Sequence, residues 1–111
     1  MLIKRGELYW VNLDPPVGSE QIGRRPVLLI QNDTGNQFSP TIIVAPLTTK
    51  GSGKEYPMHV QITKGIAGLK ADSVALLSQI RTLDKSRLGK KIGFLPSSVM
   101  DKVDWAIKRS L

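Results

Sequence analysis

The chain has no cysteine among its 111 residues and only one histidine. Without cysteine there can be no disulfide, no thiolate metal site and no cysteine nucleophile. A single histidine also excludes a ribonuclease site built from two histidines of one chain. The absence of cysteine suits a reducing compartment, and we expect the protein to act in the cytoplasm.

Aromatic residues, long apolar runs and metal-ligand patterns are also scarce. Aromatics make up 5% of the residues, too few for a broad base-stacking platform. No apolar run is long enough to span a membrane, and no signal peptide is recognisable, so we expect no membrane contact. No carboxylates or histidines stand at metal-ligand spacing, and there is no phosphate-binding glycine motif, so we expect no metal or other cofactor.

Positive charge is plentiful. Lysine and arginine number 16 against 9 acidic residues, which gives a net charge of +7. Such an excess favours a polyanionic partner such as nucleic acid, although a merely solubilising basic surface is the simpler alternative. The length suits one domain with one core, over residues 1–111.

The residue pattern predicts a mostly β fold with one late helix. Six strands are expected, at 7–13, 25–30, 41–48, 58–62, 72–80 and 92–95. Turns are expected at 32–36 and 65–68, a bulge or sheet edge near Pro46, and a short helical turn at 85–88 capped by Asp84. Together they predict a small barrel or half-barrel.

The last segment has the periodicity of a helix. Ser98 is a suitable N-cap, and Asp101 is expected in the first turn, where it would meet the helix dipole. Val99, Val103, Ile107 and Leu111 recur every four residues and predict one apolar face.

The segment 18–33 places a polar loop before Arg24, Arg25, Pro26 and an apolar strand. The proline favours an extended backbone at Arg25, and a guanidinium held on a rigid strand suits phosphate. Successive strand side chains point to opposite faces, so Arg24 and Arg25 diverge, as do Thr48 and Thr49. Two solvated surface charges are the alternative for the arginine pair.

Further polar residues mark other candidate positions. Gln79 and Arg81 should share one face at the end of the strand 72–80. Lys50 and Lys54, next to several glycines, suit a basic rim for phosphates. His59 is more simply explained as a structural residue.

Several motifs in order resemble the MazF/PemK family of toxin endoribonucleases. They are Lys4-Arg5-Gly6-Glu7-Leu8-Tyr9, Gly18-Ser19-Glu20-Gln21, Arg25-Pro26-Val27-Leu28, Gln31-Asn32-Asp33, Thr48 and Ser78-Gln79-Ile80-Arg81-Thr82-Leu83-Asp84-Lys85. The resemblance implies an SH3-like twisted β-barrel with a C-terminal helix, working as a homodimer. It also implies sequence-specific, metal-independent cleavage of single-stranded RNA that leaves a 2′,3′-cyclic phosphate and a 5′-hydroxyl.

By the same resemblance, Arg25 and Thr48 are the catalytic residues. Attack by the ribose 2′-hydroxyl needs no protein nucleophile, and a preorganised guanidinium stabilises the charge that develops on phosphate. The residues expected to bind RNA are Ser19, Glu20, Gln21, Arg24, Thr49, Lys50, Lys54, Gln79 and Arg81. An ordinary polar loop at 19–21 and a strand-end hydrogen bond at Gln79 remain the alternatives there, and the general base is not assigned.

The resemblance further implies a type II toxin silenced by an acidic antitoxin. Two other functions share the fold. Gyrase-poisoning relatives end in Trp-Gly-Ile, whereas Trp105 is followed here by Ala106 and Ile107 and the chain continues. This difference, together with Arg25 and Thr48, favours the nuclease over the gyrase poison. The third possibility, a plain RNA-binding module, would bind RNA without cutting it.

Overall fold

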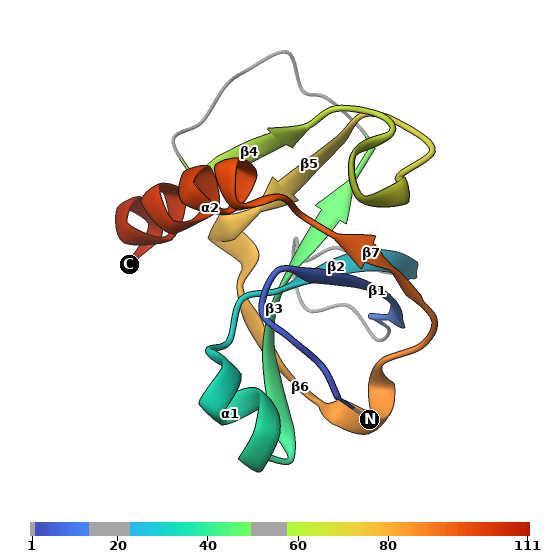
Figure 1. Cartoon of the computed structure of the whole chain (residues 1–111), viewed down its shortest axis with the longest axis vertical. Coiled ribbons are helices and arrows are strands. Elements are labelled where there is room, and N and C mark those ends of the chain that lie inside the picture. Colours follow the sequence, from blue (N-terminus) through green and yellow to red (C-terminus); the bar gives the residue numbers. More distant parts are fainter. Residues whose placement is uncertain (1, 14–22, 50–57) are drawn as a thin grey trace.

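The computed structural model describes residues 2–13, 23–49 and 58–111. The strands are β1 (Glu7–Asn12), β2 (Arg24–Leu29), β3 (Thr41–Thr48), β4 (His59–Ile62), β5 (Ser73–Leu76), β6 (Arg81–Asp84) and β7 (Lys91–Phe94). The helices are α1 (Asp33–Phe38) and α2 (Ser97–Ser110), and the 3-10 turns are η1 (Ile66–Gly68), η2 (Leu77–Gln79) and η3 (Lys85–Arg87). Figure 1 shows α2 beside β4 and β5, with α1 at the other end of the molecule.

The strands form a single bent sheet in the order β4-β5-β3-β2-β1-β7, with β6 also paired to β3. The long strand β3 pairs with β2 along one edge. Along its other edge it pairs first with β6, up to Val44, and then with β5, from Leu47. Pro46 lies where the partner changes, so the expected bulge or edge at this proline is in fact a change of neighbour in a central strand. The mostly β half-barrel with a C-terminal helix confirms the predicted fold class.

Two apolar clusters fill the two faces of the sheet. One includes Leu8 and Leu28 and packs beneath α2 through Val103. The other includes Tyr9 and Val27. Since neighbouring residues of β2 serve different clusters, that strand is buried on both faces, as its continuous apolar run predicts.

The expected turn at 32–36 is instead the start of a helix. Asn32 is its N-cap, and its side chain accepts a hydrogen bond from the Gly35 N–H at 2.8 Å. Asn and Gly are typical of turns and also of N-caps, so local composition does not separate the two. The buried Asn36 then holds the helix down by exchanging hydrogen bonds with Gln31.

The single strand expected at 72–80 is broken by η2. Continuing the β3–β5 register, in which Leu47 faces Ala75, would place Ser78 opposite Val44. Instead Val44 faces Arg81, so three residues have been inserted. Leu77 turns into the core, where its side chain is 1% exposed. This break bends the sheet and creates β6, which the pattern did not separate from β5.

Helix α2 begins two residues earlier than predicted. Pro96, not Ser98, is the N-cap residue and makes no side-chain capping bond, and the first turn holds no acidic residue. Pro is well suited to a helix start because it has no N–H to satisfy. Val99 and Val103 are buried as predicted, but Leu111, just after the last helical residue, is 91% exposed. Asp84 caps η3 as predicted, accepting the Ser86 N–H at 2.9 Å.

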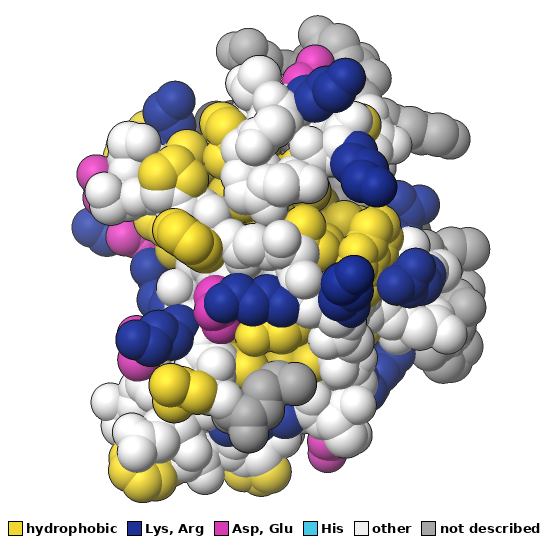
Figure 2. Space-filling model, turned by 45° about the vertical axis from the view of Figure 1, so that its right-hand side comes forward, with side chains coloured by type: hydrophobic (Ala, Val, Ile, Leu, Met, Phe, Trp, Pro, Cys, Tyr) yellow, Lys and Arg dark blue, Asp and Glu magenta, His cyan; other side chains and the backbone are white. Residues whose placement is uncertain are grey.

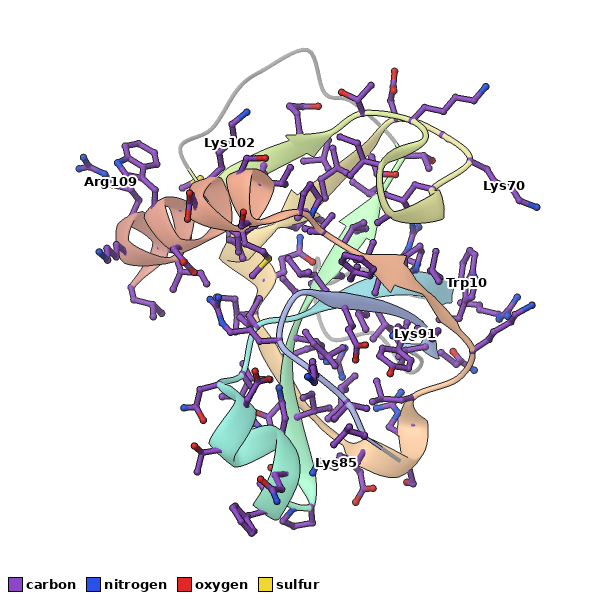
Figure 3. The ribbon with its side chains drawn as sticks, viewed as in Figure 1. Trp10, Lys70, Lys85, Lys91, Lys102 and Arg109 are labelled. Atoms are coloured by element: carbon purple, nitrogen blue, oxygen red, sulfur yellow. The ribbon has the colours of Figure 1, made fainter. Side chains whose placement is uncertain are left out.

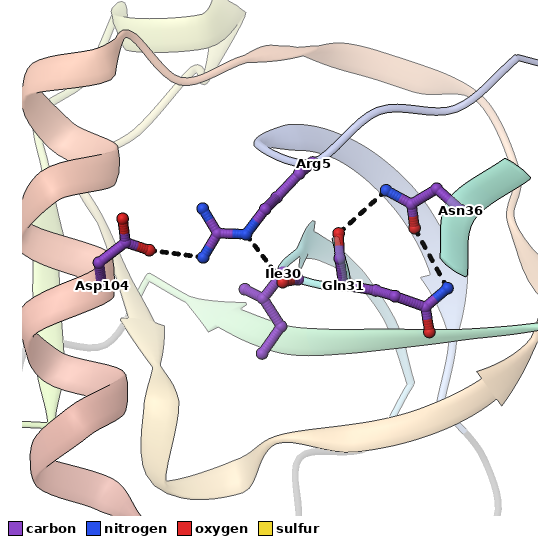
Figure 4. A network of polar contacts seen from close by, with 5 residues as sticks. All are labelled: Arg5, Ile30, Gln31, Asn36 and Asp104. Carbon is purple, nitrogen blue, oxygen red and sulfur yellow. Dashed lines mark hydrogen bonds and ion pairs between the residues drawn. The ribbon is translucent and has the colours of Figure 1, made fainter. Parts of the chain in front are cut away.

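Arg5 ties the N-terminal segment to both helices. Its guanidinium donates to the Ile30 carbonyl at 2.9 Å and pairs with Asp104 of α2. Its backbone N–H donates to the carboxylate of Asp33 in α1. Figure 4 shows the guanidinium between Asp104 and Ile30, next to the Gln31–Asn36 pair. The network fixes the approach to β1 and hence the strand that borders the site described next.

Candidate active site

A pocket of about 210 Å³ opens where β1, β2, β3 and β5 come together. It is lined by Trp10, Arg24, Arg25, Pro26, Leu47, Thr48, Thr49 and Ser73. Both residues expected to be catalytic, Arg25 and Thr48, therefore lie in one pocket. So do two of the residues expected to bind RNA, Arg24 and Thr49.

The strand register explains why Arg25 and Thr48 meet. In the β2–β3 pair Val27 lies opposite Pro46. Continuing that register by two residues brings Arg25 opposite Thr48. Directly opposed residues of an antiparallel pair project from the same face, with Cβ atoms about 4.5–5.5 Å apart. Both side chains are half-buried, which suits groups held in place yet open to a ligand.

Arg24 leaves the strand in the other direction and covers Trp10. Its guanidinium carbon lies 4.6 Å from the centre of the indole ring, in cation–π geometry. Arg24 is exposed and Trp10 half-buried, so Trp10 lies at the surface of the chain and outside both apolar clusters. Trp10 shares a strand face with the fully buried Leu8, so the alternation of β1 gives no signal of its outward position.

The charged residues described in the lining of this pocket are all basic. Arg24, Arg25 and the hydroxyl-bearing residues Thr48, Thr49 and Ser73 are among the residues that line it, and none of its described lining residues is acidic. Arginine forks bind phosphate oxygens bidentately, and hydroxyls add further hydrogen bonds to them. The pocket can therefore hold a phosphate group between Arg25 and Thr48.

Gln79 and Arg81 do not line this pocket. The strand that was expected to carry both ends at Leu76, so Gln79 lies in η2 and Arg81 in β6, and they do not share a strand face. Both side chains are half-buried. One guanidinium nitrogen of Arg81 is buried without a hydrogen-bond partner among the described residues. The remaining predicted residues, Ser19, Glu20, Gln21, Lys50 and Lys54, lie outside the described residues.

His59 of β4 lies beside Ser78 of η2. Its Nε2 atom is 3.4 Å from the serine hydroxyl oxygen. Partial burial lowers the pKa of His59 below its ordinary value, which favours the neutral imidazole at pH 7. It is not among the residues that line the pocket of Arg25 and Thr48, and this position suits the structural role predicted for it.

Across the described ranges 2–13, 23–49 and 58–111, no group of three histidine or acidic side chains is arranged to hold a metal ion. Neither α1 nor α2 nor any other helix in these ranges has the length and hydrophobicity needed to cross a membrane.

The chain matches known proteins over nearly its whole length. Residues 4–111 match the family described as PemK-like, MazF-like toxin of type II toxin-antitoxin system. Endoribonuclease EndoA of Bacillus subtilis is 54% identical over 111 residues, covering 100% of this chain and 96% of the relative. Endoribonuclease MazF of Staphylococcus epidermidis is 53% identical over 110 residues, covering 99% and 92%.

Solved structures show the same fold. MazF from Deinococcus radiodurans superimposes with a TM-score of 0.82 at 27% identity, covering 98% of this chain and 96% of that one. A mycobacterial endoribonuclease in complex with its cognate antitoxin also gives 0.82, at 22% identity and covering 97% and 93%. The full-length identity above 50% to two endoribonucleases carries the assignment of activity. The chain therefore belongs to the PemK-like, MazF-like toxins of type II toxin–antitoxin systems, and it is an endoribonuclease.

Proposed function

We propose that the pocket of Arg25 and Thr48 binds the scissile phosphate of single-stranded RNA. The observation that supports this most directly is that one pocket holds both residues, together with Arg24 and Thr49, and that none of its described lining residues is acidic. The negative charge of a phosphodiester complements the two arginines of the lining. The expected sequence-specific cleavage of mRNA follows if the bases on either side are bound by neighbouring residues.

Cleavage proceeds by attack of the ribose 2′-hydroxyl on the adjacent phosphorus. The 2′-oxygen loses its proton and forms the new bond to phosphorus, while the 5′-oxygen leaves and takes up a proton. The products are a 2′,3′-cyclic phosphate and a 5′-hydroxyl end. Arg25 stabilises the charge on the equatorial phosphate oxygens, and Thr48 donates a hydrogen bond to one of them. Holding attacking and leaving oxygens in line supplies much of the remaining rate.

A substrate with one altered sugar tests this chemistry. Wild-type protein should cut a long RNA in excess chelator and leave a cyclic phosphate at the new 3′ end. An RNA with deoxyribose immediately 5′ to the scissile phosphate should still bind, because phosphate contacts supply most of the affinity, but should not be cut. Normal cleavage of the deoxy-substituted RNA would indicate an activated water, and loss of cleavage in chelator would indicate a metal.

The other predicted residues extend this site. We assign base contacts to Gln79 and phosphate or base contacts to Arg81, Ser19, Glu20 and Gln21, with Lys50 and Lys54 forming a basic rim. The substrate is cellular mRNA, so the enzyme acts in the cytoplasm.

An acidic antitoxin is the expected inhibitor, and a homodimer the working form. The mycobacterial relative was solved with its cognate antitoxin, and the Deinococcus radiodurans protein as a MazE–MazF complex with 28% identity to this chain. A segment that folds across the site with carboxylates near Arg25 would exclude RNA. Binding should weaken as salt rises, and light scattering at low micromolar concentration should give twice the chain mass. A fully active monomer would contradict the dimer.

A further inference from the structure

A second pocket, of about 410 Å³, adjoins the pocket of Arg25 and Thr48 at Trp10. It is lined by Trp10, Pro26, Thr49, Gly68, Leu69, Lys70, Ala71, Ser73, Lys90, Lys91 and Ile92. Four of these, Trp10, Pro26, Thr49 and Ser73, also line the pocket of Arg25 and Thr48. The two pockets are therefore continuous, and a chain that occupies one can extend into the other.

One wall of this second pocket is formed by η1, whose backbone packs directly against the backbone of β7. A Cβ atom on Gly93 would lie 2.2 Å from the Ala67 carbonyl oxygen, so the two backbones touch at a place where only glycine fits. Ala67 itself adopts a left-handed φ of 57°, between Gly65 and Gly68, which also have positive φ. A non-glycine residue held in this conformation costs energy that the surrounding packing must supply. The pocket is thus a fixed feature of the fold.

Its interior is apolar and its edge is cationic. Leu69 is buried, while Lys70 and Lys90 are exposed. Lys91 also lines the pocket, but its ammonium group pairs with the carboxylate of Glu7, a residue that is 6% exposed. Figure 2 shows an apolar area flanked by several lysine or arginine side chains, and in Figure 3 Trp10 and Lys70 project from the side of the molecule away from α2. No acidic residue is among the described residues that line the pocket.

From this arrangement, and resting on the proposed cleavage at Arg25 and Thr48, we propose that the second pocket binds a nucleotide that flanks the scissile phosphate. The base enters the apolar interior beside Trp10, and a phosphate lies against Lys70 and Lys90. Because the two pockets share lining residues, an RNA whose scissile phosphate lies between Arg25 and Thr48 can extend its backbone into the second pocket. The cationic edge matches its charge.

The size and lining favour a nucleotide over a side chain of an acidic peptide. A volume of about 410 Å³ lies within the range of roughly 300–1,000 Å³ typical of pockets for small molecules, and one side chain would leave much of it empty. Among the described lining residues there is no amide or guanidinium side chain to read a base edge. The pocket therefore holds any of the four bases and adds affinity without adding sequence specificity.

Trimmed substrates test the proposal. Once the cleavage site in a long RNA is mapped, its flanks are shortened one nucleotide at a time from each end. For the wild type, loss of one flanking nucleotide should raise KM and leave kcat unchanged. An abasic residue at that position should raise KM by a smaller factor, because it removes the base and keeps the phosphate. The double variant Lys70→Ala/Lys90→Ala should raise KM on the long RNA about tenfold and lower its salt slope by roughly 0.7, the change for one phosphate contact. On the trimmed RNA the double variant should differ little from the wild type.

Lys102→Ala/Lys108→Ala is the matched control, because it removes two exposed lysines from α2 with the same change of charge. It should leave the dependence on RNA length intact. If Lys70→Ala/Lys90→Ala raises KM by the same factor on long and trimmed RNA, the proposal is wrong, but the proposed cleavage at Arg25 and Thr48 is unaffected. Length-independent cleavage combined with lysine-dependent binding of an acidic, leucine-containing peptide would assign the pocket to a protein partner and overturn it. If the wild type does not cut the mapped RNA at all, the proposed function itself fails.

Discussion

Among the glycines that the structure describes, Gly93 is the one where an added methyl group should destabilise the fold most. A Cβ there would lie 2.2 Å from the carbonyl oxygen and 2.8 Å from the carbonyl carbon of Ala67, whereas ordinary contacts begin at 3.4 Å. The obstacle is backbone, not the flexible end of a side chain, so η1 would have to move by about 1 Å or β7 would have to shift.

We expect Gly93→Ala to lower the free energy of unfolding by about 3 kcal/mol, at the upper end of the cost of overpacking. That is a large share of the roughly 5–15 kcal/mol that stabilises a typical domain. Gly65→Ala is the control, because its φ is +95° but no atom lies within 4 Å of the added Cβ. It should cost only about 1–2 kcal/mol, from the left-handed backbone alone.

Urea unfolding followed by circular dichroism, at one protein concentration for all variants, measures both changes. Gly93→Ala should have the lower midpoint of the two. The reasoning is refuted if Gly93→Ala unfolds at the same urea concentration as the wild type, or at a higher one than Gly65→Ala.

Two further predictions concern stability. Val103→Ala should lower the free energy of unfolding, measured in urea, by about 2 kcal/mol, because Val103 is 0% exposed. Leu111→Ala should leave it unchanged, because Leu111 is 91% exposed. Equal effects of the two substitutions would contradict the described packing of α2. The pKa of Asp33 is lowered from 3.8, chiefly by the hydrogen bond that its carboxylate accepts from the Arg5 N–H. The ionised carboxylate therefore stabilises the fold above pH 3.8, and this stabilisation is lost as the pH falls below that value. Asp33→Asn should therefore be less stable than the wild type at pH 7, and this difference should shrink below pH 3.8; a difference that does not change with pH would count against the bond.

Much of the fold follows from local pattern. The bounds of β3 match the predicted 41–48, and the expected apolar strand is β2, which lies between β1 and β3 in the sheet. The break at Leu77–Gln79 could not be predicted in this way, because residues 72–80 are compatible with one continuous strand. What divides them is the change of partner along β3, a tertiary effect that local propensity does not contain.

The candidate site was predictable in part for the same reason. The motif placed Arg25 before Pro26 and Thr48 at a strand end, and the β2–β3 register then brings the two together. The position of Gln79 and Arg81 depended on the strand that η2 interrupts, so the prediction of a shared face failed. The contribution of Trp10 was missed because an aromatic residue in a strand is most often buried, whereas here Arg24 covers it from outside.

The most direct test of the central claim is the single-turnover rate of RNA cleavage by variants of the shared pocket. Arg25→Ala and Thr48→Ala should each fold normally and cut at least about 10²-fold more slowly, the usual cost of losing one preorganised donor at a developing oxyanion. Because both groups act on one phosphate, the double variant should lose far less than the product of the two single losses. A folded Arg25→Ala protein that cuts RNA at the wild-type rate would contradict the account.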